Sequence, residues 1–367
     1  MHVAIVGSGQ LARMMALSGW EMGVTFAFLA EPTEGTACVE GLGSIVTRTP
    51  ELSGQALYEA LGKPDVVTVE REHVDTDLLS TLLPHCNVHP NPSAISITKH
   101  RCREKDFVSS LGIKTAPYRP ANGKESLEAG IRAMGLPVIV KSSEDGYDGR
   151  GQWKLDNEAD VVAFLQEDNL DRDFVIEGLV AFSREVSIIT TRSASGECAS
   201  YPLTENDHQN GILITSLAPA DADESPLLAE ASRIAETMIE ALDYVGILSV
   251  ELFVVGDELV VNELAPRVHN SGHWTQAAGI SSQFENHVRA ILDFKLGNTA
   301  PKGHTAMVNV LGLSLDKAWL TEGNVQLHDY NKEPRPGRKV GHLNLHADDR
   351  EALIEQMNAL RARIYQN

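Results

Sequence analysis

Residues 247–274 read ILSVELFVVGDELVVNELAPRVHNSGHW, and their pattern sets the architecture of the second half of the chain. Two runs of Val, Leu and Ile are separated by a short polar connection that contains glycine, which predicts a β-hairpin. With a three-residue loop at residues 256–258, Glu251 would lie directly across from Glu263 on one face of the hairpin. A two-residue turn would instead set Glu251 opposite Asn262. The facing pair of carboxylates is therefore predicted only for the longer loop.

Two facing carboxylates repel each other, and this repulsion favours a cation between them. The cost is about 0.2–1 kcal/mol for an exposed cross-strand pair and is larger for a buried one. Carboxylate oxygens beside a phosphate site suit magnesium, which also takes oxygens from a bound nucleotide. Spacing alone leaves the choice open, because two solvated strand glutamates would show the same sequence.

The opening of the chain predicts a βαβ unit. Residues 2–30 read as a buried strand, a glycine turn, an amphipathic helix and a second strand, and the apolar run at 65–70 continues this pattern. The turn GSGQLA at 7–12 lies between strand and helix, where backbone amides attract an anion such as phosphate. Glu31 follows the second strand, near the place of the ribose-binding acid in dinucleotide folds, so an NAD-type site is one interpretation. A tight turn that binds nothing is the alternative.

A second hairpin carries a glycine-rich connection. Residues 136–155, LPVIVKSSEDGYDGRGQWKL, read as a β-branched strand that ends on Lys141, a loop and a second strand. A lysine at a strand end supplies a point charge, and backbone amides freed by glycines can surround phosphate oxygens. The loop is therefore a candidate flap over a polyphosphate, with a mobile exposed hairpin tip as the alternative. Residues 174–192 then read as two strands, and residues 226–246 as an amphipathic helix that stops at Gly246.

Two further segments concentrate basic or polar side chains. Residues 332–342, KEPRPGRKVGH, predict a stiff basic loop because of their prolines and glycine, and a phosphate ester would suit it. A solvated basic turn is the alternative. Residues 267–274 hold two histidines four apart, which on a helix could bind zinc. Asn270, Ser271 and Gly272 argue against a helix, so we expect a polar turn that contacts a substrate, with a purely structural turn as the alternative.

Composition limits the class of protein. The chain has 367 residues, 43% of them hydrophobic, which is enough for two or three domains with sizeable cores. A formal net charge of -20 disfavours binding to nucleic acid or to anionic membranes. The 4 cysteines form no CxxC pair, and no segment resembles a leader or a membrane span, so we expect a cytoplasmic protein without disulfides. The predicted fold class is an α/β opening followed by α+β elements.

Six segments carry a resemblance to a known family: GSGQLARMMA, VVTVEREHVD, VIVKSSEDGYDGRGQW, YPLTENDHQNGIL, NELAPRVHNSGHWT and RPGRKVGHLNL. Together they closely resemble the ATP-grasp ligases, and within them the 5-(carboxyamino)imidazole ribonucleotide synthases of purine biosynthesis. The lysine, the glycine loop and the paired glutamates are common to ATP-grasp enzymes. APRVHNSGHWTQ and RPGRKVGH resemble this one branch, and the resemblance covers nearly the whole chain.

The resemblance implies an ATP-grasp fold in three parts: an N-terminal Rossmann-like domain at residues 1–100, a small lid subdomain at 101–180 and a C-terminal ATP-grasp domain at 181–367. It implies an enzyme that uses ATP, magnesium and bicarbonate to carboxylate 5-aminoimidazole ribonucleotide, releasing ADP and phosphate through carboxyphosphate. A homodimer and a separate mutase that receives the product are also implied.

The resemblance further implies a role for individual residues. The expected ATP contacts are Arg101, Lys141, Gly146, Tyr147, Asp148, Gly149, Arg150, Gly151, Gln152, Glu177, Gly178, Leu179, Val180, Glu185, His208, Asn262 and Glu263. The expected ribonucleotide contacts are Gly9, Gln10, Leu11, Glu70, Glu72, Tyr147, His269, Asn270, Ser271, Arg335, Arg338 and Lys339. Asp148, Lys332 and Arg267 are the expected catalytic residues, and Glu251 and Glu263 the expected magnesium ligands.

One position departs from the wider ATP-grasp pattern. Ala265 lies two residues after Glu263, where many ATP-grasp proteins have an asparagine ligand, so Asn262 is a candidate replacement. The nearest alternative enzyme is another ATP-grasp ligase, such as a formate-dependent glycinamide ribonucleotide formyltransferase. An NAD-dependent oxidoreductase built on GSGQLA, and a nucleotide sensor that binds ATP without turnover, are more distant alternatives.

Overall fold

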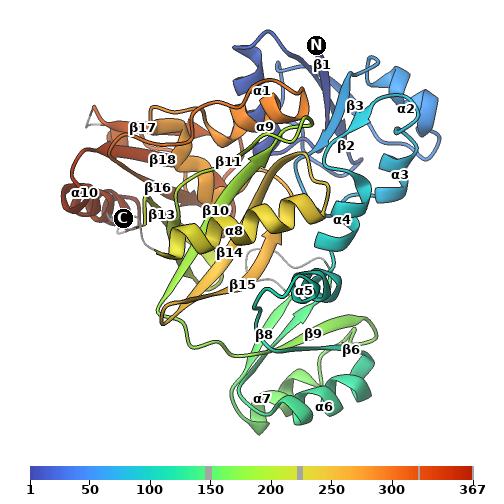
Figure 1. The fold of residues 1–367 in the computed structure, drawn as a ribbon, viewed down its shortest axis with the longest axis vertical. Helices are drawn as coiled ribbons and strands as arrows, with labels where there is room; N and C mark the ends of the chain where they lie inside the picture. The colour runs from blue at the N-terminus through green and yellow to red at the C-terminus, as the bar shows by residue number, and fades with distance from the viewer. Residues whose placement is uncertain (145–150, 221–225, 321–322, 366–367) are drawn as a thin grey trace.

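The structure is a computed structural model, and it describes residues 1–144, 151–220, 226–320 and 323–365. The described strands form three sheets of five, four and nine strands. In Figure 1 the five-stranded sheet lies at the N-terminal end of the long axis, the nine-stranded sheet in the middle and the four-stranded sheet at the other end. Among the described helices, none is both long enough and apolar enough to cross a membrane.

The five-stranded sheet is parallel throughout, with strand order β3-β2-β1-β4-β5. Its strands are β1 (His2–Val6), β2 (Thr25–Ala30), β3 (Ser44–Thr47), β4 (Val66–Val69) and β5 (Asn87–Val88), and its helices are α1 (Gln10–Trp20), α2 (Gly54–Ala60), α3 (Thr76–Ser80) and α4 (Pro92–Thr98). Parallel strands need crossover helices and become buried on both faces, which explains the continuous apolar runs of β1, β2 and β4. The predicted βαβ unit is confirmed.

The four-stranded sheet is antiparallel, with order β6-β9-β7-β8. Its strands are β6 (Tyr118–Asn122), β7 (Val138–Ser142), β8 (Gln152–Leu155) and β9 (Asp173–Gly178), and the helices of this region are α5 (Arg101–Ser110), α6 (Gly123–Met134) and α7 (Glu158–Phe164). The pairing of β7 with β8 confirms the second predicted hairpin, in which Lys141 pairs with Gln152.

The nine-stranded sheet has the order β15-β14-β10-β12-β13-β16-β18-β17, and β11 pairs with β10 beside this path. Its strands are β10 (Arg184–Arg192), β11 (Cys198–Ser200), β12 (Thr204–Gln209), β13 (Ile212–Ala218), β14 (Gly246–Val255), β15 (Glu258–Ala265), β16 (His304–Leu311), β17 (Val325–Asp329) and β18 (Lys339–Ala347). The helices that pack on it are α8 (Pro226–Ala241), α9 (Gln283–Ile291), α10 (Arg350–Tyr365) and the 3-10 helices η1 (Asn270–Ala277) and η2 (Lys317–Leu320).

Three predicted elements differ from the structure. The loop predicted at 332–342 is shorter, because β18 begins at Lys339. The helix predicted to run to Gly246 ends at Ala241, and Gly246 begins β14 with a φ of 116°. The segment predicted as a turn at 267–274 contains η1, so the argument against a helix is wrong for a 3-10 helix. A 3-10 helix tolerates this sequence because the side chain of His269 caps it, accepting a hydrogen bond from the backbone N–H of Ser271.

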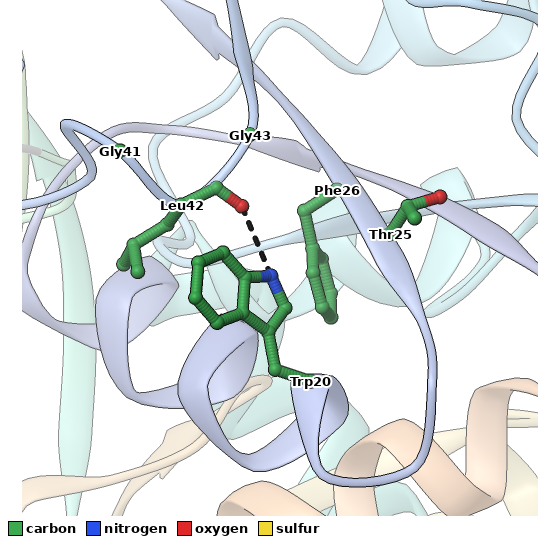
Figure 2. A pocket seen from close by; sticks show the side chains of 6 residues that line it. All are labelled: Trp20, Thr25, Phe26, Gly41, Leu42 and Gly43. Carbon is green, nitrogen blue, oxygen red and sulfur yellow. Dashed lines mark hydrogen bonds between the residues drawn. The ribbon is translucent and has the colours of Figure 1, made fainter.

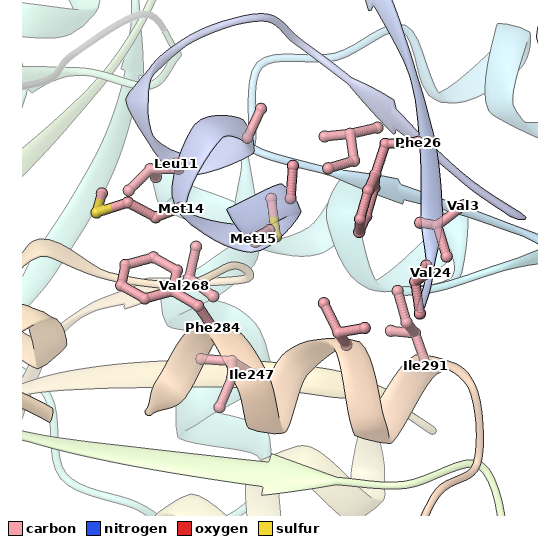
Figure 3. Packing of buried hydrophobic residues seen from close by; sticks show 14 of the residues in the cluster. Val3, Leu11, Met14, Met15, Val24, Phe26, Ile247, Val268, Phe284 and Ile291 are labelled. Carbon is pink, nitrogen blue, oxygen red and sulfur yellow. The ribbon is translucent and has the colours of Figure 1, made fainter. Parts of the chain in front are cut away.

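Side-chain alternation gives the nine-stranded sheet two different faces. Even-numbered residues of β10 and β14 pack with α8: Val186, Ile188, Leu248, Val250, Leu252 and Val254. Ile189 and Ile247, which are odd-numbered, pack instead in a core shared with α1 and α9, where Leu11 and Met14 of α1 lie against Phe284 (Figure 3). The odd-numbered polar residues of β10 and β14 therefore face α9 and η1, and Glu251 is one of them.

His287 of α9 connects the N-terminal sheet to the central sheet. Its fully buried ring accepts a hydrogen bond at Nδ1 from the backbone N–H of Ile247, at 3.1 Å, and its Nε2 lies 2.8 Å from Oγ1 of Thr68. Because Nδ1 faces an N–H, Nε2 carries the proton and donates to Thr68. Burial lowers the pKa of His287 to about 3, so the ring is neutral at neutral pH.

We expect the variant His287→Gln to be most destabilised at neutral pH and progressively less so in acid. The pKa of His287 is lower in the folded protein than its ordinary value of 6.5, so its contribution is complete above that value and declines as the pH falls towards about 3. The gap in unfolding free energy between wild type and variant should narrow by up to about 1.4 kcal/mol per pH unit. Urea unfolding at several pH values measures this gap, and a constant gap would contradict the assignment.

Candidate active site

The connection between β14 and β15 is a two-residue turn, so the predicted three-residue loop is wrong. Val255 pairs directly with Glu258, leaving only Gly256 and Asp257 in the turn. Gly256 is the first central residue and has a φ of 61°, which a two-residue hairpin turn can require at that position and glycine adopts at little cost. If the ladder continued regularly from this turn, Glu251 would face Asn262.

A β-bulge at Asn262 restores the pairing of the two glutamates. The register shifts by one residue next to Glu251, which pairs with Glu263. The side chains confirm the shift, because Val261 and Leu264, three residues apart, both pack in the core under α8. A bulge inserts one residue into one strand and re-aims the side chains beyond it. The facing carboxylates predicted from the sequence are confirmed, although the bulge and not the turn produces them.

Each of the paired glutamates has a partner. Oε1 of Glu251 lies 3.1 Å from Nε2 of His269, and Oε2 of Glu263 lies 3.4 Å from the guanidinium of Arg101. Burial would raise the pKa of Glu251, but the hydrogen bond from His269 and the nearby charges of His208 and Arg267 hold it below its ordinary value of 4.5. Glu251 is therefore ionised at neutral pH.

The donor set fits magnesium. Mg²⁺ is usually held by one or two protein carboxylates, with water and phosphate oxygens completing its shell. Glu251 and Glu263 supply two carboxylates on facing strands. In the part of the chain that the structure describes, no group of three or more His, Cys, Asp or Glu side chains could hold a metal ion.

A buried ion-pair cluster lies at the junction of the two antiparallel sheets. The carboxylate of Glu177 on β9 is 2.8 Å from Nζ of Lys141 on β7 and 3.0 Å from Nζ of Lys105 on α5. All three side chains are almost completely buried. Burial would raise the pKa of Glu177, but Lys141 and Lys105 together lower it to about 2. The cluster therefore holds one net positive charge, which points to a negatively charged ligand.

The bulge residue connects this cluster to the hairpin. Nζ of Lys105 donates to the backbone oxygen of Asn262 at 3.3 Å, and Nζ of Lys141 reaches its side-chain Oδ1 at 3.5 Å. Arg101, the first residue of α5, reaches the carbonyl oxygen of Ser142 at 3.4 Å as well as Glu263. Both oxygens of Asn262 thus face lysines, which does not favour the suggested role of its side chain as a metal ligand.

Part of the predicted flap lies outside the described residues: Gly146, Tyr147, Asp148, Gly149 and Arg150. Gly151 and Gln152 follow it, and the carbonyl oxygen of Gly151 accepts a hydrogen bond from Ser142 at 2.8 Å. This contact brings the end of the flap beside the end of β7, one residue beyond Lys141.

The segment predicted to hold adenine links the two antiparallel sheets. Glu177 and Gly178 end β9, Leu179 is exposed, and Val180 is half-buried in the connection to β10. The backbone N–H of Gly178 donates to the carbonyl oxygen of Pro117, at 2.8 Å. These residues run from the buried ion-pair cluster towards the first residues of β10.

Glu185 and His208 form an ion pair on the site face of the central sheet. Nδ1 of His208 on β12 lies 2.8 Å from Oε2 of Glu185 on β10. Burial lowers the pKa of His208, but Glu185 and Glu251 raise it by more, so the pKa lies above its ordinary value. The charge interaction with Glu251 shows that this pair lies close to the paired carboxylates.

Glu70 occupies the N-terminus of α1, where the sequence suggested a phosphate. Its carboxylate accepts hydrogen bonds from the backbone N–H of Gly9 at 2.5 Å and of Ala12 at 2.9 Å. A Cβ on Gly7 would lie 2.3 Å from the Glu70 side chain, and Gly7 has a φ of 121°, so glycine is required there. The two amides are therefore not free for a phosphate or for the pyrophosphate of NAD.

Other features of the N-terminal unit also separate it from a dinucleotide site. Glu31, the suggested ribose-binding acid, pairs with Arg48 at 3.0 Å. Leu11, which the resemblance placed against the ribonucleotide, is buried in the core between α1 and α9 (Figure 3).

The basic loop after β17 reaches the start of α1. Nζ of Lys332 donates a hydrogen bond to Oε1 of Gln10, and Nδ2 of Asn331 donates to the carbonyl oxygen of Ala37. Burial lowers the pKa of Lys332. Arg338 is half-buried and donates to the backbone oxygen of Glu333, at 3.3 Å. Residues nearly 300 positions apart in the sequence therefore lie side by side.

The other basic residues of this loop have different surroundings. Arg335 is exposed and pairs with Glu333 at 3.7 Å, so it does not point into the protein. Lys339 begins β18 and lies near His208, whose pKa its charge lowers.

Arg267, which follows β15, pairs with Glu72, which follows β4 of the N-terminal unit. Its guanidinium forms a two-point ion pair with Glu72, at 2.5 Å from Nε and 3.2 Å from Nη2. Burial would lower the pKa of Arg267, but the ion pair with Glu72 and the charges of Glu263 and Glu251 raise it. Burial would raise the pKa of Glu72, and Arg267 lowers it to about 2.

The η1 segment lines the same region. The side-chain amides of Asn270 and Asn309 exchange two hydrogen bonds, at 2.8 and 3.1 Å. Ser271 is almost completely buried, and its hydroxyl contacts the side chains of His269 and Ser187, both within the protein. Ser271 is thus surrounded by protein groups, and its contact with a substrate stays a prediction.

A pocket of about 410 Å³ lies elsewhere on the N-terminal unit. It is lined by Trp20, Thr25, Phe26, Gly41, Leu42 and Gly43, and Figure 2 shows the indole N–H of Trp20 bonded to the carbonyl oxygen of Leu42. Trp20 ends α1, so it lies about 15 Å along the helix axis from Gln10. None of the lining side chains is ionisable, and the pocket is separate from the charged site.

Sequence reasoning missed two charged residues of α5. Lys105 lies four residues after Arg101, so the helical period places both on one face, and this signal was available in HRCREK. Glu104 accepts a hydrogen bond from the backbone N–H of Leu264, at 3.0 Å. Burial, with Glu263 nearby, raises the pKa of Glu104 to about 8. No local sequence signal marks Glu104.

Three sequence families match successive parts of the chain. The Ribonucleotide synthetase preATP-grasp domain matches residues 1–99, the ATP-grasp domain residues 106–284 and the Phosphoribosylaminoimidazole carboxylase C-terminal domain residues 305–356. A protein of Brucella melitensis named N5-carboxyaminoimidazole ribonucleotide synthase is 41% identical over 347 residues, which cover 93% of this chain and 95% of that protein.

Solved structures show the same similarity. The N5-carboxyaminoimidazole ribonucleotide synthetase of Thermus thermophilus is 41% identical, covers 100% of this chain and 99% of its own, and has a TM-score of 0.90. The N5-carboxyaminoimidazole synthase of Aspergillus clavatus, in complex with ADP and 5-aminoimidazole ribonucleotide, is 26% identical, with 99% of each chain covered and a TM-score of 0.87.

We expect the variant Glu177→Gln to lose about 3–5 kcal/mol of unfolding free energy. The substitution removes the charged carboxylate of Glu177 and leaves the buried ammonium groups of Lys105 and Lys141 without a negatively charged partner. The matched control is Glu128→Gln, which breaks the exposed pair with Arg132 and should cost less than about 0.5 kcal/mol. Urea unfolding measures both variants, and equal effects would show that the buried cluster is not a major stabilising feature.

Proposed function

The chain belongs to the N5-carboxyaminoimidazole ribonucleotide synthase family of ATP-grasp enzymes, and we infer from this that it carboxylates 5-aminoimidazole ribonucleotide with the use of ATP, in purine biosynthesis. The observation that carries the assignment to this site is the pairing of Glu251 with Glu263 beside a buried lysine cluster. Two carboxylates for a metal and an excess of buried positive charge are the requirements for a metal-bound triphosphate.

The proposed ATP half of the site lies between the two antiparallel sheets. Lys141 and Arg101 would contact the phosphates, because Arg101 pairs with Glu263 and Lys141 reaches Asn262, the residue before it. Glu251 and Glu263 would hold magnesium, which neutralises charge on the phosphates when it is bound. The segment from Glu177 to Val180 would hold the adenine side of the nucleotide, with Glu185 and His208 near the ribose. Residues 146–152 would fold over the phosphates.

The proposed ribonucleotide half lies between α1, η1 and the basic loop. Gln10 and Lys332 already contact each other there, and Lys332 with Arg338 would bind the phosphate of the ribonucleotide. Arg267 lies between the two halves, because it pairs with Glu72 and also interacts with both proposed magnesium ligands. We place the reacting groups next to Arg267 for this reason.

Bicarbonate is the proposed source of the carboxyl group. It is a poor electrophile, and transfer of the terminal phosphoryl group of ATP would convert it to carboxyphosphate, a mixed anhydride that the amine of the ribonucleotide can attack. Lys141 and Arg101 would stabilise the charge on the transferred phosphoryl group. Carboxyphosphate reacts readily with water, so closure of residues 146–152 would protect it. Asp148 and Lys332 are the proposed proton-transfer pair.

Several features of the whole protein belong to the same proposal. We propose a division into residues 1–100, 101–180 and 181–367, a homodimer, a cytoplasmic location and transfer of the product to a separate mutase. The order of the three sheets along the chain supports the division, since each sheet is built from one continuous part of the sequence.

A phosphate-release assay tests the proposed reaction. The purified protein should release phosphate from ATP only when Mg²⁺, bicarbonate and 5-aminoimidazole ribonucleotide are all present. Phosphate release supported by formate and a glycinamide ribonucleotide, without bicarbonate, would instead identify a formyltransferase. ADP binding by calorimetry without any turnover would identify a nucleotide sensor.

We expect Arg338→Ala to raise the KM for the ribonucleotide about tenfold to a hundredfold while the KM for ATP changes little. The half-buried Arg338 lies on the loop whose Lys332 reaches α1, and removal of one charged hydrogen bond to a phosphate costs about 1.5–3 kcal/mol. Arg335→Ala is the matched comparison on the same loop and should have a smaller effect, because its side chain is exposed. Steady-state kinetics with each substrate varied measures both. Equal changes in the two KM values would show that the loop is not a dedicated phosphate clamp.

A further inference from the structure

A line of buried polar side chains crosses the central sheet and ends at Glu251. Oγ of Ser216 on β13 donates to Oδ1 of Asn206 on β12 at 2.8 Å, and Nδ2 of Asn206 donates to Oγ of Ser187 on β10 at 2.9 Å. Oγ of Ser187 donates to Oγ of Ser271 in η1, also at 2.8 Å. Oγ of Ser271 lies 2.9 Å from Nδ1 of His269.

The last link connects this line to the proposed metal site. Nε2 of His269 lies 3.1 Å from Oε1 of Glu251. Ser216, Ser187 and Ser271 are no more than 1% exposed, so water does not compete for these hydrogen bonds. We refer to Ser216, Asn206, Ser187, Ser271 and His269 as the polar chain.

Backbone groups fix the direction of every hydrogen bond in the polar chain. At the end of the polar chain away from Glu251, Nδ2 of Asn206 also faces the carbonyl oxygen of Thr204 at 3.4 Å. A carbonyl oxygen only accepts, so this atom of Asn206 must be the amide nitrogen. At the end next to Glu251, Nδ1 of His269 accepts a hydrogen bond from the backbone N–H of Ser271 at 3.3 Å, so Nδ1 carries no proton. Between these ends, each hydroxyl accepts one bond and donates the next.

The direction of the chain determines what Glu251 receives. Because Ser187 donates to Ser271, the hydroxyl hydrogen of Ser271 is directed at Nδ1 of His269. Nδ1 then accepts two hydrogen bonds, and the ring N–H is at Nε2, which donates to Oε1 of Glu251. One oxygen of Glu251 is thereby held, and the other is left for a metal ion.

The backbone of His269 is fixed independently of its ring. The side chain of Gln283 on α9 accepts from the N–H of His269 at 2.9 Å and donates to its carbonyl oxygen at 2.6 Å. With the main chain clamped by Gln283, the ring can be turned only about its side-chain bonds, and the polar chain holds that rotation. Ligand orientation by such outer hydrogen bonds commonly changes metal affinity about 10-fold to 100-fold when it is lost.

We propose that Ser187 is a positioning residue for the magnesium site: acting through Ser271 and His269, it orients the carboxylate of Glu251 for the metal ion bound with the nucleotide. This inference rests on the proposed function, which assigns Glu251 as a magnesium ligand. Neither Ser187 nor Asn206 is a predicted site residue, and both act from the sheet below the site.

The test measures binding of ADP by calorimetry at a series of Mg²⁺ concentrations. In the wild type, ADP affinity should increase with Mg²⁺, which gives a midpoint concentration for the metal. In Ser187→Ala the midpoint should rise about tenfold. The affinity for ADP without Mg²⁺ should stay within about twofold, because the orientation of Glu251 acts on nucleotide binding through the metal ion.

Ser249→Ala is the matched control. Ser249 lies on β14 two residues before Glu251, is as buried as Ser187, and its hydroxyl has no hydrogen-bond partner among the described residues. This variant removes the same atom from the same sheet, so its Mg²⁺ midpoint should equal that of the wild type. If Ser187→Ala does not fold, Ser187→Cys replaces it, because a thiol is a weaker donor of similar shape.

A double variant tests whether Ser187 acts through His269. His269→Gln keeps an N–H donor for Glu251 but removes the ring that the polar chain orients. Adding Ser187→Ala to His269→Gln should therefore change the Mg²⁺ midpoint no further. A full tenfold effect of Ser187→Ala in this background would overturn the proposed route.

The outcomes separate this inference from the proposed function. If ADP binding to the wild type does not depend on Mg²⁺, the assignment of Glu251 and Glu263 as metal ligands is wrong. If the wild type depends on Mg²⁺ and Ser187→Ala has the same midpoint as Ser249→Ala, the positioning role of Ser187 is overturned while the metal site stands.

Discussion

The geometry of the site depends on one extra residue in β15. The two-residue turn alone would turn Glu263 away from Glu251, and the bulge at Asn262 brings the two carboxylates face to face. The same residue offers both of its oxygens to Lys105 and Lys141, so the bulge also joins the hairpin to the neighbouring sheet. Two carboxylates that face each other across paired strands repel each other unless a cation lies between them. The bulge is therefore a local cost that the proposed magnesium ion would offset.

Most of the buried charge around the hairpin lies in ion pairs, with one lysine in excess. Glu177 neutralises one of its two lysines, and Glu72 pairs with Arg267. Buried ion pairs add little to stability compared with apolar side chains, because desolvation offsets their attraction. Their consequence here is electrostatic: the carboxylates of Glu177 and Glu72 stay ionised, and two buried lysines face the single carboxylate of Glu177. A chain of net charge -20 thus presents a local site for an anion.

The two halves of the site are built by different kinds of contact. The proposed nucleotide half is formed by two antiparallel sheets and α5, which meet at Glu177 and Asn262. The proposed ribonucleotide half is formed where the loop after β17 reaches α1, through the contact of Lys332 with Gln10. Arg267 lies between them because η1 follows directly after β15. The position of Glu70 on the N-terminus of α1 gives that helix end an internal carboxylate instead of a bound anion.

The sequence by itself determined the local elements: the βαβ opening, both hairpins, Lys141 at a strand end and the resemblance carried by its motifs. These follow from periodicity and turn chemistry over a few residues. Only the tertiary structure decided the bulge at Asn262, the role of Glu70 as a helix cap and the line from Ser187 to Glu251. Each of these depends on partners about 60 to 160 positions away, such as Gly9 for Glu70 and Lys105 for Asn262. A backbone register or a side-chain hydrogen bond of that kind is set by which surfaces pack together, and no local pattern in the chain encodes it.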